Sequence, residues 1–243
     1  MMRLLLIDAG NSRIKWATVK ENLWSHHGVL DNREISALPV AFADLPPPDR
    51  IFISNVAGED MAQRLCAACI SWPCQAEFIT AQPVQCGVRN GYAHPDQLGS
   101  DRWAALIAAW HQERAPCLVV NCGTATTVDA LSATGEFLGG LILPGVNLMQ
   151  NSLAAGTSQL PRATGIWREF PLNTADAIFS GSVQATIGAI QLQQHALAAA
   201  GNVRCLLSGG AADTIQPHLR LPFSRVDNLV LRGLYLISQE NNS

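Results

Sequence analysis

The chain has 243 residues, of which 48% are hydrophobic and 14% are charged, and its formal net charge is -3. This composition indicates a tightly packed globular protein, long enough for two domains of about 100–150 residues each. The absence of a basic excess argues against nucleic acid or an anionic membrane surface as a partner. No apolar run reaches the roughly 18 residues that a membrane span needs.

The seven cysteines stand in a chain whose N-terminus does not read as a secretion signal, because Asp8 stops the apolar run 4–7. An odd number of cysteines in this setting predicts reduced thiols and a cytoplasmic protein. Cys66 and Cys69 have the spacing of zinc ligands, and Cys74 follows, but zinc needs a second close pair of Cys or His. The segment also reads as a helix, in which cysteine packs as a small hydrophobe. The sequence therefore leaves the role of this cluster open.

The first half of the chain opens with a predicted hairpin. Apolar runs at 4–7 and 14–19 flank the turn 8–12. Further elements follow, a strand at 50–54, a helix at 59–71, a strand at 76–80 and a helix at 100–111. The last of these is the clearest, because Trp103, Leu106, Ile107 and Trp110 fall on one face.

The second half begins with another predicted hairpin. A strand at 117–120 and a strand at 125–131 flank a small polar turn. The later elements are a strand at 141–145, a helix at 182–200, a strand at 205–207 and a helix at 226–239. Two such hairpins, about 110 residues apart, indicate a weak internal duplication of a mixed sheet with helices against it. The sequence therefore predicts two domains, 1–116 and 117–243.

The segment 8–15, Asp-Ala-Gly-Asn-Ser-Arg-Ile-Lys, lies at the first turn and has the composition of a phosphate-binding loop. Gly10 allows the backbone to approach an anion closely, and Lys15 adds a positive charge. Asp8 stands at the end of a strand, where it could hold Mg²⁺ directly or through water. The same residues also suit an ordinary hairpin turn rich in Asp, Gly and Asn. This segment alone leaves both interpretations open.

The segment 121–129, Asn-Cys-Gly-Thr-Ala-Thr-Thr-Val-Asp, has a similar composition at the second hairpin. A glycine followed by hydroxyl side chains could wrap the other side of a polyphosphate, although threonine also favours strands. The glycines of 208–210 could bring backbone close to an adenosine. No Gly-x-x-x-x-Gly-Lys-Ser/Thr sequence is present, which excludes a P-loop nucleotide-binding protein.

The segment Gly99-Ser100-Asp101-Arg102 marks the start of the clearest predicted helix. A carboxylate and a guanidinium at a helix N-terminus would suit a general base and an anchor for a substrate carboxylate. The helix dipole also favours an acidic residue at this place, with the arginine simply solvated. Without the other motifs, this structural explanation is the better one.

Taken in order along the chain, these segments resemble type III pantothenate kinases, the family that includes the Bvg accessory factors. The similar segments are 8–15 and 121–129 (two phosphate loops), 99–102 and 173–178 (substrate segments) and 139–145 (a Gly-Gly-x-Ile-x-Pro-Gly stretch). The similarity runs from end to end. It implies the α/β fold of the acetate and sugar kinase, chaperone and actin superfamily. That fold has two duplicated ribonuclease H-like domains, with mixed sheets flanked by helices, whose facing hairpins grip ATP.

The resemblance implies an ATP-dependent kinase that phosphorylates the hydroxyl of pantothenate to 4'-phosphopantothenate, the first step of coenzyme A biosynthesis. It implies Asp101 as the proton acceptor. The ATP-binding residues that it implies are Asp8, Ala9, Gly10, Asn11, Ser12, Arg13, Ile14, Lys15 and Thr124. The substrate residues that it implies are Tyr92, Gly99, Ser100, Asp101, Arg102 and Thr174. It also implies a homodimer, Mg²⁺ at Asp8 and a monovalent cation, K⁺ or NH₄⁺.

One position departs from the family pattern. The second phosphate loop of the family begins with an Asp that is tied to the monovalent cation, whereas this chain has Asn121. An amide oxygen can still bind K⁺ but brings no charge, so cation dependence stays open.

For phosphoryl transfer, positioning and charge neutralisation matter more than covalent chemistry. An Asp101 of near-normal pKa is expected to suffice, because the proton leaves late in a loose transition state. One alternative is a kinase of the same fold that acts on a sugar, on another small hydroxy or carboxylic acid, or on polyphosphate. Polyphosphate would call for a cluster of basic residues, which the 16 Lys and Arg residues do not form in the sequence. Another alternative is a non-catalytic nucleotide-binding regulatory protein, against which the presence of Asp8, Lys15 and Asp101 argues.

Overall fold

The structure, a computed structural model, describes residues 2–156, 165–198 and 201–240. The chain forms two compact units, one of residues 1–111 with 229–243 and the other of residues 112–228. None of the described helices is long and apolar enough to cross a bilayer. The predicted domains, 1–116 and 117–243, are the two copies of a duplication and not two compact units. This division stays a prediction.

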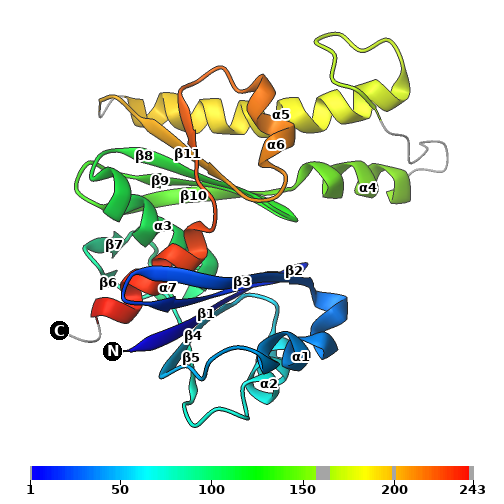
Figure 1. Cartoon of the computed structure of the whole chain (residues 1–243). Helices are drawn as coiled ribbons and strands as arrows, with labels where there is room; N and C mark the ends of the chain where they lie inside the picture. The colour runs from blue at the N-terminus through cyan, green and yellow to red at the C-terminus, as the bar shows by residue number, and fades with distance from the viewer. Residues whose placement is uncertain (1, 157–164, 199–200, 241–243) are drawn as a thin grey trace. The chain divides into compact units, whose positions relative to one another are not determined.

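The first unit is built on a sheet with the strand order β3-β2-β1-β4-β5 (Figure 1). Its strands are β1 (Arg3–Ala9), β2 (Arg13–Lys20), β3 (Leu23–Asp31), β4 (Arg50–Asn55) and β5 (Ala76–Phe78). The strand β2 pairs antiparallel with both β1 and β3. The strand β4 lies parallel to β1, and β5 lies parallel to β4. The predicted N-terminal hairpin is thus confirmed, and the turn between β1 and β2 lies beside the end of β4.

Helices cover both faces of this first sheet, because its central strands are apolar on both sides. The other elements of the unit are η1 (Asn32–Ala37), α1 (Leu38–Ala43), α2 (Glu59–Ala68), β6 (Val84–Gln85), β7 (Val88–Asn90), η2 (Pro95–Gln97), α3 (Ser100–Glu113) and α7 (Leu229–Glu240). Leu5 and Ile7 of β1 pack with Phe42 and Leu65 of α1 and α2 on one face. The C-terminal helix α7 lies against β1 and β4. Burial on both faces explains why β1 and β4 read as continuous apolar runs.

Two glycines of the first unit mark close approaches. A Cβ atom on Gly28 would overlap the ring of Trp16, its partner on the neighbouring strand. A Cβ atom on Gly233 of α7 would overlap the backbone of Ala104 in α3. The first glycine fixes the register of β2 against β3, and the second lets α7 meet α3 backbone to backbone.

The second unit has a sheet in which neighbouring strands follow the order β10-β9-β8-β11-β12. Its strands are β8 (Cys117–Cys122), β9 (Ala125–Leu131), β10 (Glu136–Pro144), β11 (Arg204–Ser208) and β12 (Phe223–Arg225). The first three pair antiparallel, and β11 and β12 add in parallel. The sequence of pairings is the same as in the first unit.

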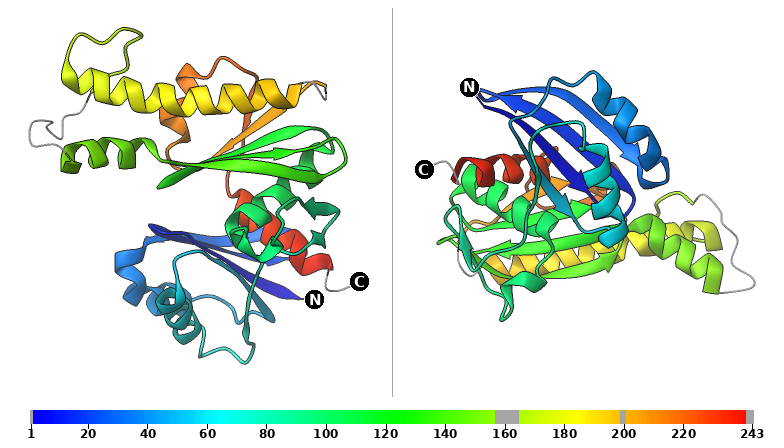
Figure 2. Two further views of the ribbon diagram at one scale, coloured as in Figure 1. Left: turned by 180° about the vertical axis from the view of Figure 1, so that it is seen from behind. Right: turned by 90° about the horizontal axis from the view of Figure 1, so that it is seen from below.

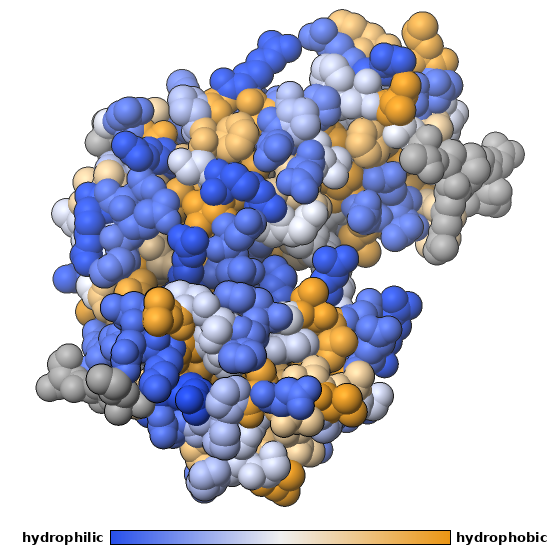
Figure 3. Space-filling view, viewed as in Figure 1, coloured by the Kyte–Doolittle hydropathy of each residue, from blue (hydrophilic) through white to orange (hydrophobic). Residues whose placement is uncertain are grey.

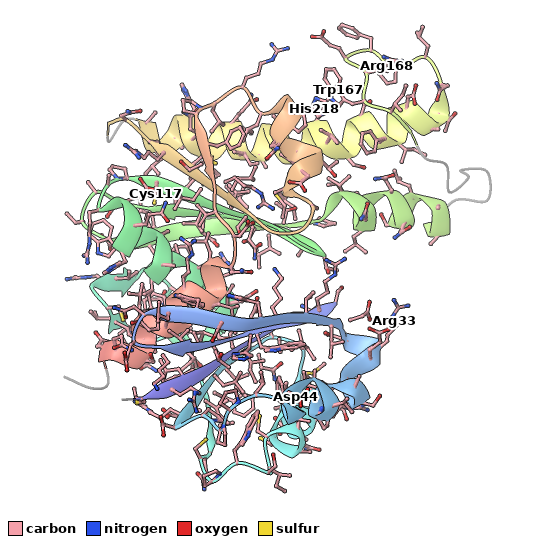
Figure 4. All side chains as sticks on the ribbon, viewed as in Figure 1. Arg33, Asp44, Cys117, Trp167, Arg168 and His218 are labelled. Atoms are coloured by element: carbon pink, nitrogen blue, oxygen red, sulfur yellow. The ribbon has the colours of Figure 1, made fainter. Side chains whose placement is uncertain are left out.

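One long helix covers a face of the second sheet (Figure 2). The helices of this unit are α4 (Val146–Gly156), α5 (Thr174–Ala198), α6 (Ala212–Ile215) and η3 (Gln216–His218). The core contains Val120 and Val128 from the sheet and Ile190 from α5. Trp167, before α5, stacks on His218 with ring centroids 4.4 Å apart (Figure 4). The helix α5 begins well before the predicted residue 182, and the predicted end at 200 lies outside the described residues.

Both units are therefore mixed sheets flanked by helices, built with one repeated strand order. This confirms the α/β fold class with two copies of the same sheet topology that the two hairpins predict.

Candidate active site

The first predicted phosphate loop is the turn between β1 and β2. The N–H of Gly10 donates to the carbonyl of Arg13 at 3.1 Å and closes the turn. Asn11 and Ser12, at its tip, are exposed. A Cβ atom on Gly10 would meet only the carbonyl oxygen of Arg13, at an ordinary 3.5 Å. The turn itself therefore does not require glycine, and the missing side chain leaves the loop backbone open to a ligand.

Asp8 lies one residue before the end of β1, between Lys15 of β2 and Ser54 of β4, its two partners in the sheet. Burial and, to a smaller extent, the negative charge of Asp101 together raise the pKa of the Asp8 carboxyl from 3.8 to about 7, and the charge of Lys15 opposes this change. Only part of the side chain is exposed. Asp8 and Asp101 are far apart in sequence, but both belong to the first unit, and the charge of Asp101 acts on the pKa of Asp8.

Asp101 lies in the first turn of α3. Its Oδ1 accepts a hydrogen bond of 2.8 Å from the N–H of Arg102, one of the donors that a helix N-terminus leaves free. A Cβ atom on Gly99 would come within 2.7 Å of the same Oδ1. Burial raises the pKa of Asp101, and the N–H and charge of Arg102 oppose this. The raised pKa follows from the position of this helix start among protein atoms rather than in solvent.

A buried pair of hydroxyl groups joins the strand beside Asp8 to the helix that carries Asp101. The Oγ atoms of Ser54 and Ser100 lie 2.9 Å apart. Ser54 is fully buried and Ser100 is 6% exposed. This hydrogen bond holds the start of α3 against the end of β4, so the two carboxylates are carried by connected elements.

Arg102 is buried beside Tyr92. Its Nη1 donates to the phenol oxygen of Tyr92 at 3.0 Å, and its guanidinium lies 5.8 Å from the centre of that ring. Asn90 fixes the backbone of this loop, since its Oδ1 accepts from the N–H of Tyr92 at 3.0 Å and its Nδ2 donates to Pro95 at 3.2 Å. Arg102 is therefore held in place rather than solvated, which contradicts the structural explanation of this residue.

In the second unit, Asn121 lies near the end of β8. Its partners in the sheet are Thr127 of β9 and Ser208 of β11. The side chain is partly exposed. It occupies the position in β8 that Asp8 has in β1, one residue before the strand ends.

The second predicted phosphate loop is the turn between β8 and β9. The N–H of Gly123 donates to the carbonyl of Ala125 at 3.0 Å, as in the first hairpin. The carbonyl of Thr124 accepts from the N–H of Gly145 at 2.8 Å. A Cβ atom on Gly145 would overlap the backbone of this turn. The Gly145 backbone of the predicted Pro-Gly stretch thus packs directly against the backbone of the second loop.

The predicted glycine turn at 208–210 lies beside the same loop. Gly209 has a φ of 94°, and a Cβ atom on it would overlap the backbone of Cys122. The N–H of Ala211 donates to the carbonyl of Cys122 at 2.9 Å. Arg225 donates to the carbonyl of Gly209 at 3.0 Å. The turn and the second loop therefore form one rigid group within the second unit.

Thr174 begins α5 and borders a hollow of about 590 Å³. Its other lining residues include Leu153 of α4 and Pro171, Leu172 and Asn173. The Nδ2 of Asn173 donates to Asp176 at 2.8 Å and fixes the start of the helix. The hollow is wide open to solvent, and its lining is mostly apolar.

Comparison with known proteins identifies the family. A family model described as type III pantothenate kinase matches residues 4–195. A type III pantothenate kinase of Aromatoleum aromaticum is 50% identical over 238 residues, which cover 98% of each chain. The chain belongs to the type III pantothenate kinase family.

Solved structures agree on the fold of this family member. A Baf family protein of Campylobacter jejuni has a TM-score of 0.61 and 22% identity and covers 98% of both chains. A glucokinase of an Antarctic psychrotroph has a TM-score of 0.51 and 12% identity over the whole of both chains. At these identities the likeness concerns the fold alone.

Kinases of this family use ATP and a divalent metal ion. Mg²⁺ is usually held by one or two carboxylates together with phosphates and water. The pKa of Asp8, raised to about 7 by burial and by Asp101, means that its ionised form lacks enough positive charge nearby. A divalent cation would supply that charge, so Asp8 fits the metal.

The cysteines do not form such a site. Among the described residues, no group of three or more His, Cys, Asp or Glu side chains could hold a metal ion. Cys66, Cys69 and Cys74 are free thiols. Cys69 packs in the core of the first unit, and burial raises its pKa to about 12.

The first unit of this pantothenate kinase brings together the predicted residues of the first loop, Tyr92 and the segment 99–102. Asn121, Thr124 and Thr174 lie in the second unit, and their part in a common site stays a prediction. Sequence reasoning missed Ser54 and Asn90. Ser54 ends a predicted buried strand, and a small polar residue at that place was the available signal.

Proposed function

We propose that this chain transfers the γ-phosphoryl group of ATP to the hydroxyl of pantothenate and so forms 4'-phosphopantothenate for coenzyme A biosynthesis. Membership of the family over nearly the full length supports this activity. The observation that carries it is the buried hydrogen bond of 2.9 Å between Ser54, the neighbour of Asp8 in the sheet, and Ser100, the neighbour of Asp101 at the start of α3. A phosphate site and a candidate base thus belong to one site.

In this proposal, residues 8–15 bind the ATP phosphates through the backbone of the open turn and the charge of Lys15. Thr124 adds a contact from the second loop. Asp8 holds Mg²⁺, directly or through water, and the ion when bound neutralises charge on the phosphates. The glycine turn at 208–210 is the proposed neighbour of the adenosine.

Asp101 is the proposed proton acceptor. Its raised pKa makes it a stronger base than an ordinary aspartate, which suits proton transfer near neutral pH. It orients the hydroxyl and takes its proton late, because the transition state of phosphoryl transfer is loose. The backbone N–H of Arg102 and the space left by Gly99 hold the carboxylate in one orientation.

Arg102 is the proposed anchor for the carboxylate of pantothenate. The residue is 6% exposed and its guanidinium donates a hydrogen bond to Tyr92, and a preorganised guanidinium binds a carboxylate well. Gly99 and Ser100 line the same place, and Thr174 is proposed to line the substrate site from α5.

The Asp101→Asn substitution tests this mechanism. The variant keeps the shape of the side chain but cannot accept the proton, so kcat should fall about 100-fold or more. Binding of MgATP, measured by calorimetry, should change little. Near-normal turnover in this variant would remove Asp101 from the mechanism.

The activity itself is measured as ADP formation with and without pantothenate. ADP formation that depends on pantothenate is expected, and sugars or acetate as acceptors separate the alternative kinases. No ADP formation with any acceptor would favour a regulatory protein.

We propose further that a monovalent cation, K⁺ or NH₄⁺, binds at Asn121 through its amide oxygen, more weakly than at an aspartate because no charge is present. The same assay in K⁺, NH₄⁺ or Na⁺ buffers measures this. Equal rates in all three would contradict the site.

A homodimer in the cytoplasm completes the proposal. In Figure 3, hydrophobic surface lies among polar surface at the upper right, in the region of α4 and of the segment before α5. The exposed hydrophobic side chains of these segments are Leu148, Leu153, Ile166, Phe170 and Leu172. Such a patch is typical of a protein interface. All seven cysteines are free, which suits a reducing compartment, and cell fractionation would check the location.

A further inference from the structure

We propose that Asn32 is a positioning residue that holds the first phosphate loop in its ATP-binding conformation, an inference that rests on the proposed kinase function. Asn32 follows β3 and begins η1, away from every motif in the sequence. Its side-chain Nδ2 donates to the carbonyl of Gly10 at 2.8 Å. Its backbone N–H donates to the carbonyl of Ser12 at 2.9 Å. One residue therefore holds two carbonyl groups of the loop.

These two bonds determine where the loop presents its donors. In a trans peptide the C=O of one residue and the N–H of the next point in opposite directions, and the described residues contain no cis peptide. With the Gly10 carbonyl turned towards Asn32, the N–H of Asn11 points away from Asn32. The Ser12 carbonyl is turned towards the backbone N–H of Asn32, so the N–H of Arg13 likewise points away from Asn32. The loop can then offer backbone donors to phosphate oxygens on the side opposite Asn32.

Gly10 makes this support necessary. Glycine allows both signs of φ at little cost, so the peptide between Gly10 and Asn11 can rotate. A rotated peptide would present a carbonyl oxygen to the phosphates, where an N–H is needed. The bond from Nδ2 opposes this rotation, because it would be lost.

The other half of the amide argues against a purely structural role. The Oδ1 of Asn32 is buried and has no hydrogen-bond partner among the described residues. An unpaired buried acceptor costs at least as much free energy as one ordinary hydrogen bond contributes. The amide cannot simply turn over, because Oδ1 would then face the carbonyl of Gly10. The side chain thus adds little stability and is explained by what it does to the loop.

The test compares Asn32→Ala and Asn32→Asp with the wild type. The first removes the donor, and the second replaces it with an oxygen of the same size that faces the Gly10 carbonyl. We expect the Kd for MgATP, measured by calorimetry without pantothenate, to rise about ten-fold in Asn32→Ala, as for the loss of about 1.4 kcal/mol, and further in Asn32→Asp. The KM for pantothenate and kcat at saturating ATP should stay near wild type.

Thr18→Val is the matched control. Thr18 lies in β2, is 3% exposed and bonds to Ser25 and His26 of β3. Its replacement weakens the pairing of β2 with β3 without touching residues 10–12. This variant should lose thermal stability and keep the wild-type Kd for MgATP.

The outcomes separate the inference from the proposed function. A wild-type protein that does not bind MgATP would overturn both. A wild type that binds MgATP, with Asn32→Ala binding it equally well, would overturn the inference alone. An equal loss of affinity in Thr18→Val would do the same, because the effect would then be one of stability. If Asn32→Ala does not fold, an unchanged Kd in Asn32→Asp overturns the inference.

Discussion

At the scale of single residues, Asp8 connects the electrostatics of the site to the stability of the protein. Its pKa is raised from 3.8 to about 7 in the folded chain. Below pH 3.8 the carboxyl is protonated in both the folded and the unfolded state and has no effect. Between pH 3.8 and 7 the unfolded chain releases the proton first, so stability falls as the pH rises. Above pH 7 the full penalty remains.

Replacing Asp8 with Asn should therefore stabilise the free protein. The gain should be near zero at pH 4 and should grow to at most about 4 kcal/mol at pH 8, from 1.36 kcal/mol per pKa unit. Partial exposure of the side chain reduces it. Melting temperatures of both proteins at several pH values, without nucleotide or metal, measure this difference.

The same substitution should abolish the stabilisation that MgATP gives to the wild type. A residue that destabilises the free enzyme and binds the metal is a common compromise at active sites. A difference in melting temperature that does not change with pH would contradict the raised pKa of Asp8.

Residues of this kind mark the limit of prediction from sequence. Asp8, Lys15 and Asp101 are candidates from the sequence because the segments that carry them resemble one family in the same order along the chain, whereas each segment alone also has a structural explanation. Asn32 and Ser54 could not be predicted, since a polar residue after a strand is common. Their importance comes from partners 22 and 46 residues away in sequence, which only the folded chain reveals.

At the scale of elements, α7 and α3 meet through Gly233. A Cβ atom at this position would overlap the backbone of Ala104, and backbone cannot move aside as a side chain can. Gly233→Ala should therefore lower stability by about 2–4 kcal/mol, or about 4–16 °C in melting temperature for a chain of this size. Because α3 carries Asp101 at its start, kcat should fall as well.

Gly188→Ala is the matched control for this substitution. Gly188 lies within α5, and nothing is within 4 Å of the position of its Cβ atom. The substitution should raise stability by about 0.4–1 kcal/mol, because alanine is the better helix former. A Gly233→Ala protein as stable as Gly188→Ala would refute the close packing of α7 on α3.

The helices and strands were predictable from the sequence where an element buries one face, or where a strand buries both faces. The strands β1, β4, β8 and β11 read as apolar runs, and α3 has an apolar face. The strand β3 was missed because most of its side chains are partly or fully exposed and His26 has a φ of 48°. The helix α4 was missed because, apart from Val146, it buries no residue and so shows no clear apolar stripe.

At the scale of the whole molecule, the duplication was visible in the sequence as two hairpins and is seen in the repeated strand order of the two sheets. The place of the last helix was not visible, because an amphipathic helix can pack on any apolar face. Its packing against β1 and β4 involves partners more than 170 residues away in the sequence, and no local pattern carries that information.

The proposed homodimer can be tested through the apolar side chains that are exposed to solvent in the single chain. Phe170 is 84% exposed and Leu172 is 97% exposed. Burying one large apolar side chain contributes about 1.5–3 kcal/mol. If both are buried between subunits, Phe170→Ser with Leu172→Ser should weaken the dimer at least about 100-fold. Sedimentation velocity over a range of protein concentrations would measure the shift towards monomer.

Ile70→Ser provides the control for that experiment. Ile70 is 84% exposed but follows α2 in the first unit, whereas the apolar residues of α4 and of the segment before α5 belong to the second unit. The same change in surface hydrophobicity at this position should leave the dimer intact, since one exposed apolar residue is common on any protein surface. A wild-type protein that sediments as a monomer at all concentrations would contradict the dimer. A double variant that dimerises as well as Ile70→Ser would place the interface elsewhere, because the most exposed apolar side chains of the second unit would then remain in solvent.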